Sequence, residues 1–161
     1  MKACRFSSNI LALLLLTAST HVISGETPWG RAKARDFEYK PPKVVYDVSH
    51  NTVGAVQSVL DRASYLSTLT GADPFDSSIV LVLHGADIKY FAIENYEKYK
   101  ELVDRAQSLT VGETIKMRMC QIAAKGMGFD PEDIHGFIEM VPMGDAEIIR
   151  LQAEERHAYM R

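Results

Sequence analysis

Residues 78–85 read SIVLVLHG, and this stretch decides the fold. Residues 78–83 form a nearly continuous apolar run, which is typical of a strand that is covered on both faces. Strands of this kind belong to parallel sheets, because the helices that connect parallel strands lie on the faces of the sheet. We therefore expect a central strand at residues 78–83, followed by a turn at His84 and Gly85.

Strand and helix patterns alternate on both sides of this stretch. Apolar spacing and turn residues predict strands at residues 43–49, 113–119, 137–141 and 158–160, and helices at residues 52–69, 96–109, 121–127 and 145–156. Asp130 followed by Pro131 is typical of a capped helix start. The alternation predicts an α/β fold with a mostly parallel sheet of about five strands.

The first 24 residues have the layout of a secretory signal peptide. Lys2 and Arg5 precede the apolar run ILALLLL at residues 10–16, and Val22 and Ser24 suit cleavage before residue 25. The alternative is a membrane anchor, but this run is shorter than the roughly 20 residues that a spanning helix needs. We expect a periplasmic or secreted protein with no stable membrane insertion after cleavage. Residues 25–42 then form an arm or linker, and residues 43–161 form the domain.

Composition and charge exclude several classes of function. The chain has 161 residues, a formal net charge of −3 and a pI near 5.9, so a basic nucleic-acid interface is not expected. The 47% hydrophobic and 24% charged content is that of an ordinary folded domain rather than a disordered or collagen-like chain. Cleavage would remove Cys4 and leave Cys120 as a lone thiol, which cannot form a disulfide within the chain.

Several reactive side chains follow the predicted strands. Ligands of open α/β sheets gather beyond the carboxyl ends of the strands. Each of the first four predicted strands is followed directly by such a group, namely His50, His84, Cys120 and residues 142–145, which include Gly144. These groups could therefore approach one crevice.

Cys120 is the most informative of them. Alternation along residues 115–120 places Lys116, Arg118 and Cys120 on one face, and a helix begins directly after the cysteine. Nearby cations and a helix start both favour the thiolate, which is the nucleophilic form of cysteine. The alternative is an inert buried thiol, since cysteine is among the most buried residue types.

The histidines allow more than one interpretation. His84 could bind a ligand or transfer a proton, or it could simply anchor the turn. His135 and His157 are expected to face solvent. A soft-metal site built from His50, His84 and Cys120, for copper or zinc, is a further alternative, although no closely spaced ligand pair is present. No cofactor is expected, because Gly126 and Gly128 fit a helix end rather than a dinucleotide fingerprint.

The order of motifs resembles the DsrE/DsrF-like sulfur-relay family. The resemblance rests on the strand ending in His84-Gly85, the Met119-Cys120 pair that opens a helix, the DPEDI sequence at 130–134, and the stretch VPMGDAEIIRLQ at 141–152. It covers about residues 43–160. After the cysteine this chain reads QIA, where many relatives have GNT or a similar sequence.

The resemblance implies a three-layer flavodoxin-like domain that assembles into a homotrimer or homohexamer. It also implies that Cys120 carries sulfane sulfur as a persulfide between donor and acceptor proteins, as a carrier or sulfurtransferase-like accessory protein more than a turnover enzyme. From the residues around Cys120 we expect His84 to assist as a second catalytic residue, and Lys116, Arg118, Gly85 and Gly144 to bind substrate. The alternatives are a non-catalytic, oligomeric ligand- or protein-binding module with a buried structural Cys120, and soft-metal binding by His84 and Cys120.

Overall fold

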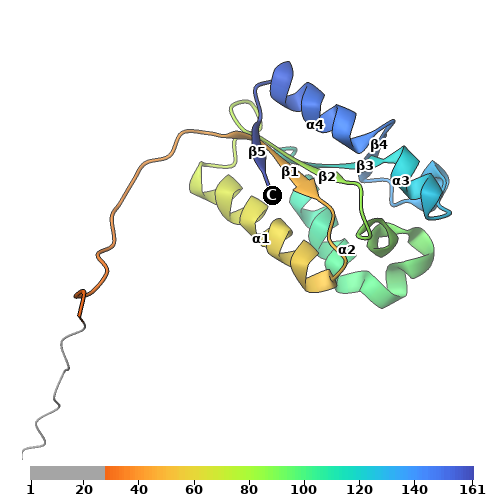
Figure 1. Ribbon diagram of the computed structural model, residues 1–161, viewed down its shortest axis with the longest axis horizontal. Coiled ribbons are helices and arrows are strands. Elements are labelled where there is room, and N and C mark those ends of the chain that lie inside the picture. Colours follow the sequence, from red (N-terminus) through yellow and green to blue (C-terminus); the bar gives the residue numbers. More distant parts are fainter. Residues whose placement is uncertain (1–27) are drawn as a thin grey trace, which may run out of the picture. The chain divides into compact units, whose positions relative to one another are not determined.

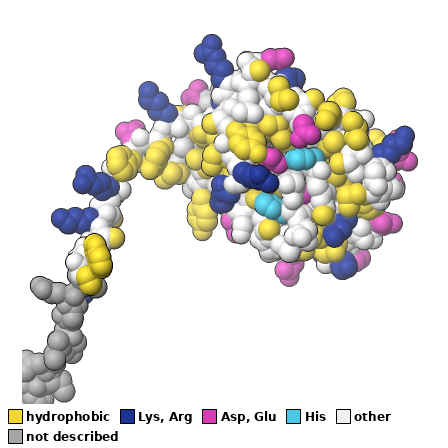
Figure 2. Space-filling model, viewed as in Figure 1, with side chains coloured by type: hydrophobic (Ala, Val, Ile, Leu, Met, Phe, Trp, Pro, Cys, Tyr) yellow, Lys and Arg dark blue, Asp and Glu magenta, His cyan; other side chains and the backbone are white. Residues whose placement is uncertain are grey.

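The computed structural model describes residues 28–161, so the predicted signal peptide at residues 1–24 lies outside the described residues. Residues 28–42 contain no helix or strand, and basic side chains are spaced along them (Figure 2). Residues 37–161 form one compact unit, which contains the whole sheet and its helices.

Five parallel strands form the sheet of this unit. They are β1 (Lys43–Val48), β2 (Ser78–Leu83), β3 (Ile115–Cys120), β4 (Ile138–Val141) and β5 (Ala158–Met160). The strand order is β4-β3-β2-β1-β5, and every pairing is parallel. The predicted α/β class is thus confirmed, with a sheet that is entirely parallel.

Helices cover both faces of the sheet. Helices α1 (Val53–Leu69) and α2 (Tyr96–Thr110) lie on one face and α4 (Gly144–Ala153) lies on the other, whereas α3 (Gln121–Gly126) is a short helix between β3 and β4 (Figure 1). The chain steps in one direction from β1 to β4 and then returns past β1 to form β5. Because crossovers between parallel strands are right-handed, this reversal places α4 on the face opposite α1 and α2.

The core follows the alternation of the strands. Val44, Tyr46, Ile79 and Leu81 belong to the large cluster under α1 and α2. The opposite face is packed by a smaller cluster, consisting of Val45, Val80, Val82, Ile148 and Leu151, in which the last two come from α4. Asp47, Arg118 and Cys120 alternate with the residues of the large cluster, so they lie on the α4 face. The candidate site is built on this face.

The remaining elements are short. They are the 3-10 turns η1 (Ile88–Phe91), η2 (Ile93–Asn95) and η3 (Pro131–Asp133). The start at Asp130 has a capping box with Asp133, but it opens a single 3-10 turn rather than an α-helix. Among the residues described, no helix is both long and apolar enough to span a bilayer.

The expectation that His157 faces solvent is wrong. Its ring is buried, Nδ1 donates to the carbonyl oxygen of Leu151 at 3.2 Å, and Nε2 lies 3.0 Å from the hydroxyl oxygen of Ser78. The burial lowers the pKa of His157. His135 is half-buried rather than exposed, beside the rings of Tyr96 and Phe137.

Candidate functional site

The candidate site spans the carboxyl ends of three neighbouring strands. Asp47 lies near the end of β1, His84 follows β2, and Cys120 is the last residue of β3. Leu83 pairs with Met119 in the parallel ladder, so continuing the register places His84 beside Cys120 on the adjacent strand. The backbone of His84 still belongs to the sheet, because its N–H donates to the carbonyl oxygen of Val48.

Gly144, the first residue of α4, packs against both His84 and Cys120. A β carbon at this position would lie 2.8 Å from Cβ of His84 and 3.2 Å from Cβ of Cys120. Only a residue without a side chain allows the start of α4 to approach the two strands this closely. Three of the predicted site residues are therefore in one place, contributed by the loop after β2, by β3 and by α4.

The imidazole of His84 is held by a carboxylate from β1. Nε2 of His84 lies 2.6 Å from Oδ1 of Asp47, and the two side chains are 20% and 17% exposed. Tyr159 of β5 donates its hydroxyl to Oδ2 of the same carboxylate at 2.5 Å. Histidine side chains reach the surface of the folded unit beside acidic and basic side chains (Figure 2).

Opposing effects set the pKa of Asp47. Burial raises it, whereas the hydrogen bonds from Tyr159 and His84 lower it, and the net result is a pKa below the usual value. The hydrogen bond to Asp47 raises the pKa of Tyr159. The carboxyl group is therefore ionised and the phenol is protonated at neutral pH.

Cys120 is a free thiol that is 5% exposed. Its Sγ accepts a hydrogen bond of 3.4 Å from the backbone N–H of Ala123, and the residue is the N-cap of α3. The cysteine thus ends a strand and begins a helix, as the sequence predicted.

The two cations that share this face have different surroundings. Arg118 donates from Nε to Glu139 at 2.7 Å and also pairs with Glu147 of α4. Its charge is therefore matched by two carboxylates rather than left for the thiol. Lys116 is exposed and lies four residues before Cys120, a separation of about 13 Å along a strand. The structure does not bring Lys116 to the cysteine.

Gly85 and His50 belong to a neighbouring pair of loops. A β carbon on Gly85 would lie 2.7 Å from Cα of Ser49, so the glycine lets the loops after β1 and β2 touch. His50 takes part through its backbone, whose N–H donates to Oδ1 of Asp87 at 3.0 Å. Asp87 is fully buried, and burial raises its pKa to about 6.

Sequence reasoning missed Asp47 and Tyr159 as parts of the site. A signal for Asp47 existed, because it is the single charged residue among the apolar positions 44–48. Tyr159 is 112 residues away from Asp47 in the chain, and only the pairing of β5 with β1 brings the two side chains together.

No group of three or more His, Cys, Asp or Glu side chains in residues 28–161 is arranged to hold a metal ion. His84 and Cys120 supply two potential soft-metal ligands, and Nε2 of His84 is already bonded to Asp47.

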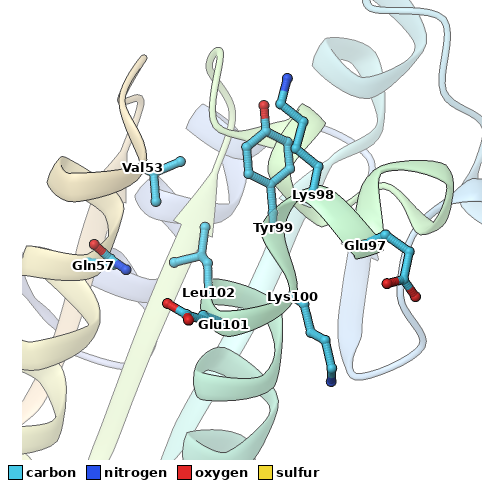
Figure 3. Close-up of a pocket in the computed structure, with 8 residues that line it drawn as sticks. All are labelled: Val53, Gln57, Glu97, Lys98, Tyr99, Lys100, Glu101 and Leu102. Atoms are coloured by element: carbon cyan, nitrogen blue, oxygen red, sulfur yellow. The ribbon is translucent and has the colours of Figure 1, made fainter.

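A separate pocket of about 470 Å³ lies between α1 and α2. Val53 and Gln57 of α1 face Leu102 of α2 across it, and Tyr99 lies at its rim (Figure 3). Tyr99 has non-helical backbone angles, so α2 is kinked beside the pocket. None of the predicted site residues lines it.

Fold and site together define a three-layer α/β protein with a cysteine and a histidine at the carboxyl edge of a parallel sheet. Residues 48–160 match the DsrE/DsrF-like family, and the chain belongs to this family. No curated protein matches the chain.

The fold is similar to that of a solved structure, MTH1491 from Methanobacterium thermoautotrophicum, which is described as a protein of unknown function. The two chains are 20% identical with a TM-score of 0.58, and the match covers 74% of this chain and 98% of the other. At this level of identity the similarity concerns the fold.

Proposed function

We propose that this protein carries sulfane sulfur as a persulfide on Cys120 and passes it to the thiol of a partner protein. It acts as a sulfur carrier or sulfurtransferase-like accessory protein, with a donor and an acceptor protein as partners. Membership of a family associated with sulfur relay supports this proposal. The observation that carries it is that His84 and Cys120 both pack against Gly144, because a histidine in this neighbourhood can accept the proton of the thiol.

The transfer needs no oxidant. The Cys120 thiolate attacks the outer sulfur of a donor persulfide, a new S–S bond forms on Cys120, and the S–S bond of the donor breaks. The donor leaves as a thiolate and takes up one proton. The reverse chemistry on an acceptor thiolate returns Cys120 to its original state.

Intact-mass spectrometry after incubation with polysulfide tests the carrier role. We expect the mature wild-type chain, residues 25–161, which lacks Cys4, to gain about 32 Da, the mass of one sulfur atom, and the mature Cys120→Ser chain to gain nothing. His84→Ala should load more slowly, whereas His135→Ala serves as a matched control on a half-buried histidine outside the site. Equal adducts on wild type and Cys120→Ser would refute the carrier role.

A second candidate function is a non-catalytic module that binds a ligand or a protein and keeps Cys120 as a structural thiol. The 5% exposure of Cys120 favours it. In that case a thiol reagent would label native protein slowly and unfolded protein fast. The carrier proposal instead requires labelling of the native protein on the timescale of sulfur loading.

We also propose export through a cleaved signal peptide, since residues 1–24 have the required three-part layout. The mature chain should begin at or near Gly25 and occur in the periplasm or the medium. N-terminal sequencing of the protein from its exported fraction tests this. A chain that retains residues 1–24 in the cytoplasm would contradict it.

A further inference from the structure

The side chain of His84 is connected to two residues that the sequence did not single out. Asp47 accepts at Oδ1 from Nε2 of His84 at 2.6 Å, and Tyr159 donates to Oδ2 of Asp47 at 2.5 Å. The three residues come from β1, β5 and the end of β2. These elements are neighbours in the sheet, so the chain of hydrogen bonds is fixed by strand pairing.

This arrangement determines the tautomer of the imidazole. An ionised carboxylate can only accept hydrogen bonds, so Nε2 of His84 carries the proton that it shares with Asp47. The neutral ring then has its free lone pair on Nδ1. Tyr159 occupies the second carboxylate oxygen and keeps the carboxylate from rotating.

Cys120 lies on the strand at the other side of His84 from Asp47. Nδ1 is bonded to Cγ, and Cγ is the ring atom that packs beside Gly144, at 3.3 Å from the position of a β carbon there. The same glycine contacts Cβ of Cys120, which the strand register places next to His84. The strand order Asp47–His84–Cys120 thus has the histidine between an acid and a thiol.

We infer that Asp47 and Tyr159 are positioning residues of the Cys120 site, which hold His84 so that its Nδ1 exchanges a proton with the Cys120 thiol. This inference rests on the proposed role of Cys120. In the step, the S–H bond breaks, the proton passes to Nδ1, and the resulting imidazolium is stabilised by the Asp47 carboxylate. The thiolate is then free to attack sulfur.

Other charged groups close to this chain of hydrogen bonds also affect it. Arg161 acts on Asp47 and Tyr159, and Asp87 lies near enough to His84 for their charges to interact. The test therefore removes individual contacts instead of relying on the effect of pH alone.

The experiment alkylates the intact protein with iodoacetamide between pH 5 and 9 and measures the rate on the peptide that contains Cys120, together with the ¹⁵N shifts of the His84 ring. We expect Asp47→Asn to slow alkylation at pH 7 about tenfold, because a histidine that is misplaced or in the wrong tautomer is a poor base for the thiol. The ring of His84 should lose its fixed Nε2–H tautomer. Tyr159→Phe should cause a smaller loss in the same direction and removes only a hydroxyl group.

Two controls and a double variant separate positioning from folding. Asp76→Asn and Tyr65→Phe change exposed residues outside the site and should leave the rate unchanged. In a His84→Ala background, Asp47→Asn should have no further effect, because Asp47 acts through the histidine. If Asp47→Asn slows alkylation equally with and without His84, the inference is overturned. It is also overturned if Asp47→Asn and Tyr159→Phe both leave the His84 tautomer and the alkylation rate unchanged.

Failure of the proposed function gives a different result. If wild-type protein takes up no sulfur from polysulfide while alkylation still depends on Asp47 through His84, the carrier role is refuted and the positioning role stands. If sulfur loads on Cys120 but Asp47→Asn changes neither the alkylation rate nor the tautomer of His84, the positioning role alone is refuted.

Discussion

Gly144 is the residue at which one methyl group should disturb the site most. We predict that Gly144→Ala lowers sulfur loading of Cys120 and destabilises the protein by about 1–3 kcal/mol, since the added carbon would overlap His84. Gly54→Ala is a matched control, because it also lies near a helix start and has open space around it. Thermal unfolding and alkylation of both variants test this. Native rates in Gly144→Ala would show that the contact is unimportant.

Asp87 provides a prediction about pH and stability. One of its oxygens, Oδ2, is buried and makes no hydrogen bond with any residue in 28–161, and burial raises the pKa of Asp87 to about 6. Between the unfolded value of 3.8 and about 6, the folded protein retains a proton that the unfolded chain has released. The contribution of Asp87 to stability therefore falls as the pH rises through this range.

We expect Asp87→Asn to remove this penalty while retaining an oxygen acceptor for the N–H of His50. At pH 8 the variant should be more stable than wild type by about 2–3 kcal/mol, and below pH 4 the two should have similar stability. Urea unfolding across this range measures the difference, with Asp76→Asn as an exposed control. Parallel stability curves for wild type and Asp87→Asn would contradict the assignment.

At the scale of elements, ion pairs fasten α4 to the sheet. Glu147 of α4 pairs with Arg118 of β3 and with Arg150 one helical turn later. The hydrogen bond from Arg150 lowers the pKa of Glu147, burial opposes this, and Arg118 lowers it further. Because the pKa is lowered on folding, the carboxylate stabilises the protein above its unfolded pKa, and this stabilisation is lost as the pH falls through the folded value.

Glu147→Gln should therefore destabilise the protein by about 2 kcal/mol at pH 7, and the difference from wild type should shrink in acid. Glu154→Gln is the matched control, because Glu154 directly follows the same helix but is 69% exposed and 3.8 Å from Arg150. Chemical unfolding of both variants at pH 7 and pH 3 tests the prediction. A loss that is as large at pH 3 as at pH 7 would show that charge is not the cause.

The helices and strands could be predicted from the sequence because their signals are local. The apolar run at Ser78–Leu83 coincides with β2, and the helical spacing after Thr52 coincides with α1. The contacts of the site depend on strand order instead, which local patterns do not contain. The links from Asp47 to His84 and Tyr159, the ion pairs of Arg118 and the burial of His157 all join elements that are distant in the chain.

The candidate site was predictable in part for the same reason. A parallel sheet collects the ends of its strands at one edge, so placing His84, Cys120 and Gly144 on that edge needed only the strand assignments. Which side chains touch there is decided by the order of β1, β2 and β3 and by the approach of α4.

At the scale of the whole molecule, we predict that the chain assembles into a homotrimer or homohexamer. Large apolar side chains remain exposed on the folded unit, including Ile122, Met143 and Ile149, as expected for a protein with subunit contacts. Multi-angle light scattering of the purified protein gives the mass of the assembly directly. A mass of one chain at all concentrations, about 18.0 kDa for residues 1–161, would contradict this prediction.

Release of sulfane sulfur to cyanide tests the central claim most directly. Cyanide removes the outer sulfur of a persulfide as thiocyanate and leaves the thiolate behind. The amount of thiocyanate therefore equals the number of carried sulfur atoms. After loading with polysulfide and removal of the excess, we predict about one thiocyanate per chain from wild-type protein and none from Cys120→Ser. The same yield from both proteins would contradict the role of Cys120 as the sulfur carrier.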